Sequence, residues 1–366
     1  MDLRLTSASD SALAGFDDII DLRAPSEFEQ DHLPGAINLP VLSDAERARV
    51  GTVYKQVSPF DARKIGAALV AANAARHIAG PLADRGGGWR PLVYCWRGGQ
   101  RSGSFAGILS QIGWRVARLE GGYKSWRRLV TQRLEVQGFD APVLVLDGNT
   151  GSAKTAILHR LAARGWQVID LEGLAQHRGS LFGAMPGGQP TQKLFEGRLA
   201  CAIEALDPTR PVLVEGESSK IGARILPRAV WRAICAAPRL RLSVPLAARA
   251  RFCAGDYADA VADPARVQAI LSQLAPLHPA DRVAQWREML DSGDVTGLAA
   301  GLMRDHYDPR YDKHRSRYAA REVGVVRLPD LNDPETAAAQ VEAALIRRDL
   351  TQAGPAGSGI WATKKG

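Results

Sequence analysis

The stretch 94–102 holds a single cysteine, Cys95, at the head of a loop rich in glycine and arginine. The apolar run 91–94 predicts a short buried strand before the loop, and a helix is predicted to follow it. Successive backbone N–H groups of such a loop point toward its centre and bind anions. This field, together with Arg97 and Arg101, favours the thiolate, which is the nucleophilic form of cysteine. A buried structural cysteine is the alternative. The predicted anion-binding loop comprises Trp96, Arg97, Gly98, Gly99, Gln100, Arg101 and Ser102.

A second stretch, 148–155, has the spacing of a phosphate-binding P-loop, G-x-x-x-x-G-K-[ST], except that Ala153 stands where the second glycine is usual. It follows the predicted strand 142–146 and precedes a predicted helix, which is the context that the motif requires. Lys154 would supply a positive charge and Thr155 a ligand for Mg²⁺. Ala153 adds a Cβ where the backbone usually approaches phosphate. The predicted loop comprises Gly148, Asn149, Thr150, Gly151, Ser152, Ala153, Lys154 and Thr155.

Further polar residues follow predicted strands of the same region. Glu215 and Glu217 come at the end of an apolar strand and resemble a Walker B carboxylate, although a solvated or salt-bridged carboxylate is an equal alternative. Asp170 ends another strand and leads to His177 and Arg178 in a glycine-containing loop. Asp170, His177 and Arg178 are therefore candidates for substrate contact, with a surface histidine as the simpler interpretation of His177.

The segment 304–321 interleaves tyrosines with arginine, lysine and histidine. Arginine binds phosphate and tyrosine stacks on bases, which is typical of single-stranded RNA recognition. Three aspartates within the segment can form ion pairs with its cations, so a solvated helix with internal ion pairs is an equal alternative. The candidate RNA contacts are Arg310, Tyr311, Lys313, Arg315 and Arg317.

Composition sets broader limits. The 366 residues are 46% hydrophobic, which is enough for two cores, and the net charge of +8 is spread over both halves of the chain. A basic chain is compatible with a polyanionic partner. The four cysteines show neither a paired nor a metal-ligand spacing, so no disulfide framework, metal site or tightly bound cofactor is indicated. The sequence shows no signal peptide and no membrane-spanning run, and we expect a cytoplasmic protein.

Three blocks around the Cys95 loop resemble the rhodanese domain, and they lie at 19–28, 32–40 and 119–127. Rhodaneses carry sulfur or a related group on the loop cysteine. Five residues separate Cys95 from Arg101, whereas sulfur-carrying rhodaneses usually have four. The longer loop resembles that of rhodanese-fold phosphatases and arsenate reductases, but Tyr94 stands where those enzymes commonly have histidine.

The order of elements predicts an α/β protein. We expect an N-terminal rhodanese-like domain at 1–138, a boundary near Gly138, and a C-terminal P-loop NTPase-like domain with a parallel sheet at 139–350. The glycine- and proline-rich end, 351–366, is predicted to be a disordered tail.

The combination of these domains with the motifs HRGS at 177–180, QPTQ-x-x-FE at 189–196 and EGESSKIG at 215–222 resembles the bacterial tRNA 2-selenouridine synthase family. The resemblance implies a transferase that replaces sulfur by selenium in 2-thiouridine at the wobble position of tRNA, in the anticodon loop, with selenophosphate as the donor. It also implies transfer of a geranyl group from geranyl diphosphate to that sulfur.

The chemistry is coherent, because S-alkylation turns a poor leaving group into a good one that a selenium nucleophile can displace. The P-loop would bind the prenyl diphosphate, the Cys95 loop the selenium donor, and the segment 304–321 the tRNA. Two alternatives stay open: a sulfurtransferase fused to an NTP-dependent kinase or ATPase, and an RNA-binding regulatory protein with a degenerate P-loop. A phosphatase is a more distant third.

Overall fold

The computed structural model describes residues 2–216 and 218–351, and within these it leaves the side chains of 259 and 260 undescribed. The chain forms two compact units: residues Met1–Val136 with Thr191–Ala205, and residues Gln137–Pro190 with the chain from Leu206 onward. Glu217 and all but the first residue of the predicted tail lie outside the described residues.

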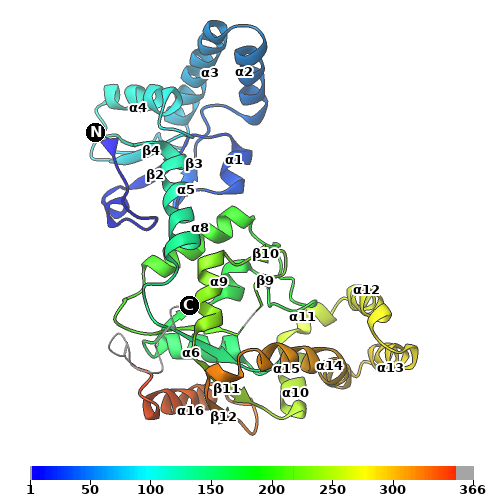
Figure 1. Cartoon of the computed structure of the whole chain (residues 1–366). Helices are drawn as coiled ribbons and strands as arrows, with labels where there is room; N and C mark the ends of the chain where they lie inside the picture. The colour runs from blue at the N-terminus through cyan, green and yellow to red at the C-terminus, as the bar shows by residue number, and fades with distance from the viewer. Residues whose placement is uncertain (1, 217, 352–366) are drawn as a thin grey trace. The chain divides into compact units, whose positions relative to one another are not determined.

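The first unit is a parallel five-stranded sheet with helices (Figure 1). The strands, in sheet order, are β1 (Asp2–Leu3), β5 (Ala117–Leu119), β4 (Pro91–Tyr94), β2 (Asp18–Asp21) and β3 (Ala36–Asn38). The helices are η1 (Ser11–Gly15), α1 (Pro25–Gln30), α2 (Asp44–Gln56), α3 (Pro59–Ala79), α4 (Gln100–Ile112), α5 (Gly122–Gln132), η2 (Arg133–Gln137, a π-helical turn that ends in the second unit) and α8 (Gln192–Glu204). The core lies between the sheet and α3 and α4, around Ile20, Val93, Phe105 and Leu109.

Helix α8 belongs to the first unit, whereas the order of elements in the sequence predicts it within a domain at 139–350. The reason is its packing against α5. A Cβ on Gly197 would lie 2.8 Å from the Trp126 ring, so the glycine permits close contact between the two helices. Arg127 forms an ion pair with Glu196 and donates to the carbonyl of Lys193 at 3.1 Å. A single boundary near residue 138 therefore does not describe the chain.

The second unit has its own parallel five-stranded sheet, as the sequence predicts. Its strands, in sheet order, are β12 (Glu322–Arg327), β11 (Arg239–Ser243), β6 (Val143–Asp147), β8 (Val212–Glu215) and β7 (Gln167–Ile169). A small antiparallel pair consists of β9 (Lys220–Ile221) and β10 (Arg224–Ile225). The helices near the sheet are α6 (Lys154–Ala163), α7 (Leu171–Ala175), α9 (Arg228–Ala236), α10 (Leu246–Asp256) and α16 (Pro334–Arg347). Helices α6 and α16 pack together over apolar side chains of β6, β8 and β11.

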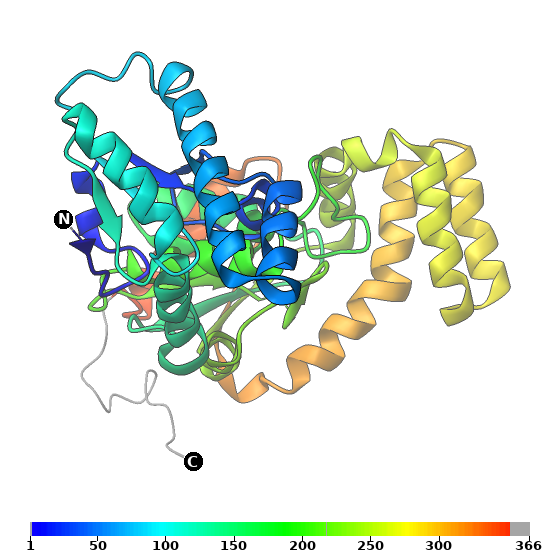
Figure 2. The same ribbon diagram turned by 90° about the horizontal axis from the view of Figure 1, so that it is seen from above.

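A helical lobe is inserted between β11 and β12 and extends away from the sheet of this unit (Figure 2). Its elements are α11 (Ala258–Val261), α12 (Pro264–Leu274), η3 (Ala275–Leu277), α13 (Ala280–Asp291), α14 (Val295–Leu302), η4 (Met303–Tyr307), α15 (Asp308–Ser316) and η5 (Ala319–Arg321). The lobe has a separate core around Trp286, Leu271 and Leu298. The described part of the chain has no helix that is both long and apolar enough to cross a membrane.

Candidate active site

Cys95 follows β4 directly and is 3% exposed. Its sulfur lies 3.2 Å from the hydroxyl oxygen of Ser102, which sits in the first turn of α4. Burial acts to raise the pKa of Cys95, but the hydrogen bonds of Ser102 and the charge of Arg101 outweigh it, and the pKa is lowered from its ordinary value. The helix start and these donors therefore favour a thiolate, which is the nucleophilic form.

Two glycines allow the backbone of the Cys95 loop to turn. Gly98 has a φ of +68° and Gly122 a φ of +61°. A Cβ on Gly122 would lie 2.3 Å from the carbonyl oxygen of Cys95, so no side chain fits there. The N–H of Tyr123 donates to that same carbonyl at 2.9 Å, and the N–H of Lys124 donates to Trp96 at 3.1 Å. The start of α5 thus holds the loop in place from one side.

The two arginines of the loop differ in their surroundings. Arg101 is partly buried and lies 3.4 Å from the carboxylate of Glu27, whereas Arg97 is exposed. Trp96 is half-buried, with its ring 5.2 Å from that of Tyr123, and Gln100 is exposed. Arg97 and Gln100 are therefore the loop side chains open to an incoming ligand.

The predicted P-loop connects β6 to α6. Ala153 has a φ of +57°, the left-handed conformation in which glycine is the favoured residue, and it forms the N-cap of α6. The chain therefore keeps the backbone conformation typical of glycine despite the alanine. Lys154 is buried, and its ammonium donates to the carbonyl of Gly148 at 3.1 Å. The ammonium also lies 5.6 Å from the centre of the Tyr311 ring.

Oxygen ligands converge beside the P-loop. The hydroxyl of Thr155 donates to Glu172 at 3.0 Å and lies 3.5 Å from a carboxylate oxygen of Glu215, which is fully buried at the end of β8. Hydroxyl and carboxylate oxygens are the ligands that Mg²⁺ prefers. Within the described residues no group of three or more His, Cys, Asp or Glu side chains is arranged to hold a metal. Thr155, Glu172 and Glu215 thus form an incomplete set of Mg²⁺ ligands.

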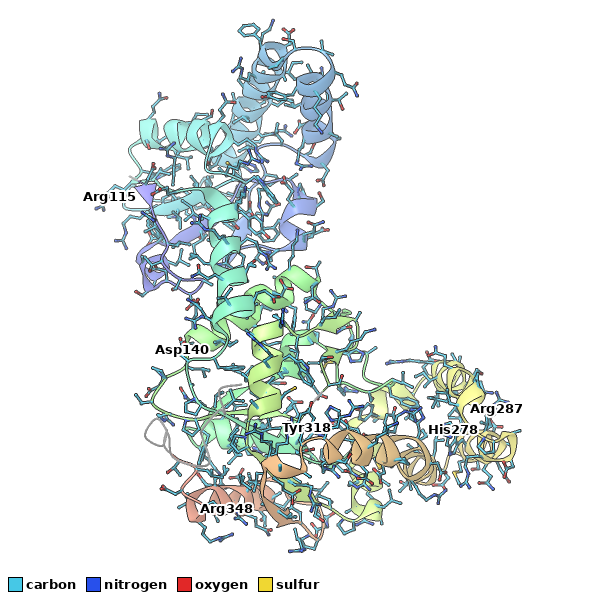
Figure 3. The ribbon with its side chains drawn as sticks, in the orientation of Figure 1. Arg115, Asp140, His278, Arg287, Tyr318 and Arg348 are labelled. Carbon is cyan, nitrogen blue, oxygen red and sulfur yellow. The ribbon has the colours of Figure 1, made fainter. Side chains whose placement is uncertain are left out.

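The P-loop opens into a pocket of about 310 Å³. Three cations line it, Lys154, Arg178 and Arg310, together with the ring of Tyr311. The guanidinium of Arg178 lies 5.1 Å from the Tyr257 ring centre. The guanidinium of Arg310 donates to Nδ1 of His306 at 2.7 Å, and His278 contacts the same nitrogen at 2.8 Å (Figure 3 labels His278). These cations make the pocket suitable for a polyanion.

A second, smaller cavity of about 70 Å³ adjoins this pocket. The two share the residues Thr150, Ser180, Cys253, Tyr257 and Tyr307. Beyond these the second cavity is lined only by apolar side chains: Phe182, Ala254, Val261, Val267, Val295, Leu298, Ala299, Leu302 and Met303. An anion-binding pocket therefore continues into an apolar hollow, most of whose lining residues belong to the helical lobe.

The lobe and α10 also fix the P-loop backbone. Arg249 forms an ion pair with Asp308 at 2.7 Å and donates to the carbonyl of Thr150 at 3.0 Å. Asp308 in turn accepts from Asn149 at 3.0 Å, and Arg315 donates to the same asparagine. Arg315 lies 3.8 Å from Asp147 as well. These contacts couple the start of α15 to the phosphate site.

The remaining predicted site residues are spread more widely. Asp170 caps α7 and contacts His159 at 2.7 Å, and neither Asp170 nor His177 lines the pocket. Burial and Arg266 lower the pKa of His177. Among the candidate RNA contacts, Arg310 and Tyr311 line the pocket and Arg315 is held at the P-loop, while Lys313 and Arg317 are exposed.

Several pocket residues were not found from the sequence. Glu172 was detectable, because it follows the end of β7, and ligands of parallel sheets bind beyond that edge. No such signal marks the apolar lining residues, because apolar side chains predict a core equally well; these residues are Phe182, Cys253, Val267 and Leu298.

The two folds and their loops define a protein that joins a rhodanese-like unit to a P-loop unit. Residues 7–129 match the rhodanese-like domain, and residues 141–293 match the AAA domain of tRNA 2-selenouridine synthase. The chain is 40% identical over 261 residues to the tRNA 2-selenouridine synthase of Aeromonas salmonicida, covering 69% of either chain. The tRNA 2-selenouridine synthase of Alcanivorax borkumensis is 34% identical, and the match covers 82% of this chain and 90% of that enzyme. The tRNA 2-selenouridine synthase of Verminephrobacter eiseniae is 35% identical, and the match covers 85% of this chain and 92% of that enzyme. The chain belongs to the tRNA 2-selenouridine synthase family, and it is an enzyme of tRNA modification.

Proposed function

We propose that this enzyme converts 2-thiouridine to 2-selenouridine at the wobble position of tRNA, through an S-geranylated intermediate. Selenophosphate is the selenium donor and geranyl diphosphate the alkyl donor. The observation that carries this proposal is the apolar cavity adjoining the cationic P-loop pocket. A prenyl diphosphate has the same two parts, a charged head and a hydrocarbon chain.

The first step is an alkyl transfer. The sulfur of 2-thiouridine attacks C1 of the geranyl chain, the C1–O bond breaks, diphosphate leaves, and the uridine gives up its N3 proton. Lys154, Arg178 and Arg310 bind the departing diphosphate and stabilise its charge. The hydrocarbon chain extends from the pocket into the apolar cavity, where its burial is favourable.

The donor set at Thr155, Glu172 and Glu215 fits Mg²⁺, because all its atoms are hard oxygen ligands. Bound there, Mg²⁺ would supply further neutralisation of the diphosphate. Arg178 and Arg310 act on the same head group independently of the ion.

The second step is a displacement at C2 of the modified uridine. The selenium of selenophosphate attacks C2, the bond to the alkylated sulfur breaks, and geranyl thiolate leaves and takes up a proton. Water then cleaves the P–Se bond, which releases phosphate and leaves selenium on C2, and N3 regains its proton. We assign the binding of selenophosphate to the Cys95 loop, because a helix start and the exposed Arg97 provide an anion site there.

A nucleotide is a weaker fit to the second unit. The ribose and base of a nucleotide need hydrogen-bonding partners, whereas the deep part of the cavity is formed by residues such as Phe182, Val267 and Leu298. This favours a prenyl diphosphate over ATP as the ligand of the P-loop.

The test is nucleoside mass spectrometry of tRNA from a deletion strain. Complementation with the wild type should restore 2-selenouridine. Cys95→Ala should leave S-geranyl-2-thiouridine without selenouridine, and Lys154→Ala should leave only 2-thiouridine. Normal selenouridine with either variant would refute the role assigned to that residue.

A further inference from the structure

The rhodanese-like unit carries a helical hairpin formed by α2 and α3, whose tip projects beyond the core of this unit (Figure 1). Val70 and Ala74 of α3 anchor the hairpin in that core. Val57 and Ser58 alone link the two helices. The hydroxyl of Ser58 accepts from the N–H groups of Phe60 and Asp61, both at 3.2 Å. The tip is therefore a capped, well-defined turn.

This tip exposes large apolar side chains. Tyr54 is 56% exposed, Val57 73% and Phe60 66%. They lie within seven consecutive residues, and α2 has no buried residue at all. Single exposed apolar residues are ordinary on protein surfaces, but three of them around one capped turn favour a binding site.

The surroundings of the tip are positively charged. Four exposed cations lie there, and none of them takes part in an ion pair within the described part of the chain: Arg49, Lys55, Arg63 and Lys64. Asp61 is the single acidic residue between positions 49 and 64. The acids nearer the start of α2 are engaged elsewhere: Asp44 contacts Ser26, and Glu46 accepts from Asn73 at 3.0 Å.

Two aromatic rings among free cations match the chemistry of an RNA loop. Unpaired bases stack on aromatic side chains, while lysine and arginine neutralise the neighbouring phosphates. A purely apolar protein partner would leave the four cations without opposite charges, whereas a nucleic acid offers bases to the aromatic rings and phosphates to the cations.

We propose that the α2–α3 tip is a tRNA-docking surface, on which Tyr54 and Phe60 stack with unpaired bases and Lys55, Arg63 and Lys64 contact phosphates. The proposal rests on the tRNA substrate of the proposed function. It adds a surface distinct from the segment 304–321, where Arg310, Tyr311 and Arg315 are engaged at the P-loop.

The test is the affinity of the full chain for bulk bacterial tRNA, measured at several salt concentrations. Tyr54→Ala/Phe60→Ala should weaken binding about tenfold or more, with an unchanged salt slope, because stacking is not electrostatic. Lys55→Gln/Arg63→Gln/Lys64→Gln should weaken binding and reduce the slope of log K against log salt by about 2. These residues are exposed, so the thermal unfolding of both variants should match the wild type.

The matched control is Ile112→Ser/Arg115→Gln, which removes an exposed apolar residue and an exposed cation elsewhere on the same unit (Arg115 is labelled in Figure 3). It should bind tRNA like the wild type. Unchanged affinity and slope in both tip variants would overturn the proposal. So would a change of oligomeric state in the aromatic variant with unchanged tRNA affinity, since this would assign the tip to a second copy of the chain. Failure of the wild type to bind tRNA would instead contradict the proposed function itself.

Discussion

The hydroxyl oxygen of Ser102 lies 3.2 Å from the sulfur of Cys95, and both groups are buried. The same hydroxyl oxygen lies 3.2 Å from the carbonyl oxygen of Gly99, within the first turn of α4, and its single proton is donated to the sulfur when Cys95 is a thiolate. A buried thiol would ordinarily resist ionisation, and this contact is one of the few that oppose burial. Ser102 therefore links the helix start to the reactivity of the cysteine.

Ser102→Ala should raise the pKa of Cys95 toward that of a buried thiol. The rate of alkylation of Cys95 by iodoacetamide at neutral pH should fall about threefold to tenfold, because less thiolate is present. Peptide mass spectrometry separates Cys95 from Cys201 and Cys253, whose pKa values burial raises to about 12. Ser104→Ala, an exposed position of the same helix, should leave the rate unchanged. Equal rates in all three proteins would contradict the role of Ser102.

Gly122→Ala should disrupt the Cys95 loop. The added Cβ would lie 2.3 Å from the Cys95 carbonyl oxygen and 2.5 Å from the backbone nitrogen of Gly98, at a φ of +61°. We expect a loss of about 4 kcal/mol or more in the free energy of unfolding of this unit, together with loss of selenation. Gly107→Ala, on α4 with nothing within 4 Å, should instead stabilise by about 1 kcal/mol. Thermal or urea unfolding measures both, and a neutral Gly122→Ala would contradict the loop geometry.

Asp31 should make the first unit less stable as the pH rises. Burial raises the pKa of Asp31 to about 6, although the hydroxyl of Tyr123 donates to it at 2.8 Å. The folded state therefore holds a proton that the unfolded chain loses near pH 4. Stability falls between about pH 4 and pH 6, by up to about 3 kcal/mol at 1.36 kcal/mol per pKa unit.

Asp31→Asn should reduce that pH dependence, because the amide does not ionise. The check is urea unfolding of the wild type and the variant at pH values from 4 to 7, with the exposed Asp84→Asn as a control. Parallel pH profiles of wild type and Asp31→Asn would exclude this carboxyl as the cause.

The depth of the apolar cavity should set the length of the prenyl chain. Leu298→Ala enlarges the hollow, so the ratio of farnesyl to geranyl transfer should increase, at a cost of about 3 kcal/mol in stability from the lost packing. Val267→Phe fills the same hollow and should lower both transfers. Competition between the two diphosphates, with products resolved by mass spectrometry, measures the ratio. An unaltered ratio in Leu298→Ala would place the hydrocarbon chain elsewhere.

Both loops were predictable from the sequence because each is local. Cys95 and Lys154 lie between a strand and a helix that are continuous with them in the chain, so a short stretch contains the whole arrangement. The placement of α8 was not predictable, since it depends on the fit of Gly197 against Trp126 across 71 positions of the chain. The apolar cavity was not predictable for the same reason. Its lining residues Phe182, Cys253 and Leu298 come from separate segments and resemble ordinary core residues in the sequence.

Arg315 shows the limit of a compositional pattern. Its place among tyrosines and cations suggested contact with RNA, yet its guanidinium donates to Asn149 and lies near Asp147 at the P-loop. The pattern could not distinguish a basic surface from a cation that supports the P-loop. That distinction required the fold of the helical lobe.

The most direct test of the two-site account uses purified protein and tRNA containing 2-thiouridine, with the donors added separately. With geranyl diphosphate alone, the wild type and Cys95→Ala should both form S-geranyl-2-thiouridine, and Lys154→Ala should form it at least about a hundredfold more slowly. The exposed Lys220→Ala should behave like the wild type. Addition of selenophosphate should then yield selenouridine with the wild type and not with Cys95→Ala. Selenouridine formed without geranyl diphosphate, or geranylation by Lys154→Ala at the wild-type rate, would contradict the account.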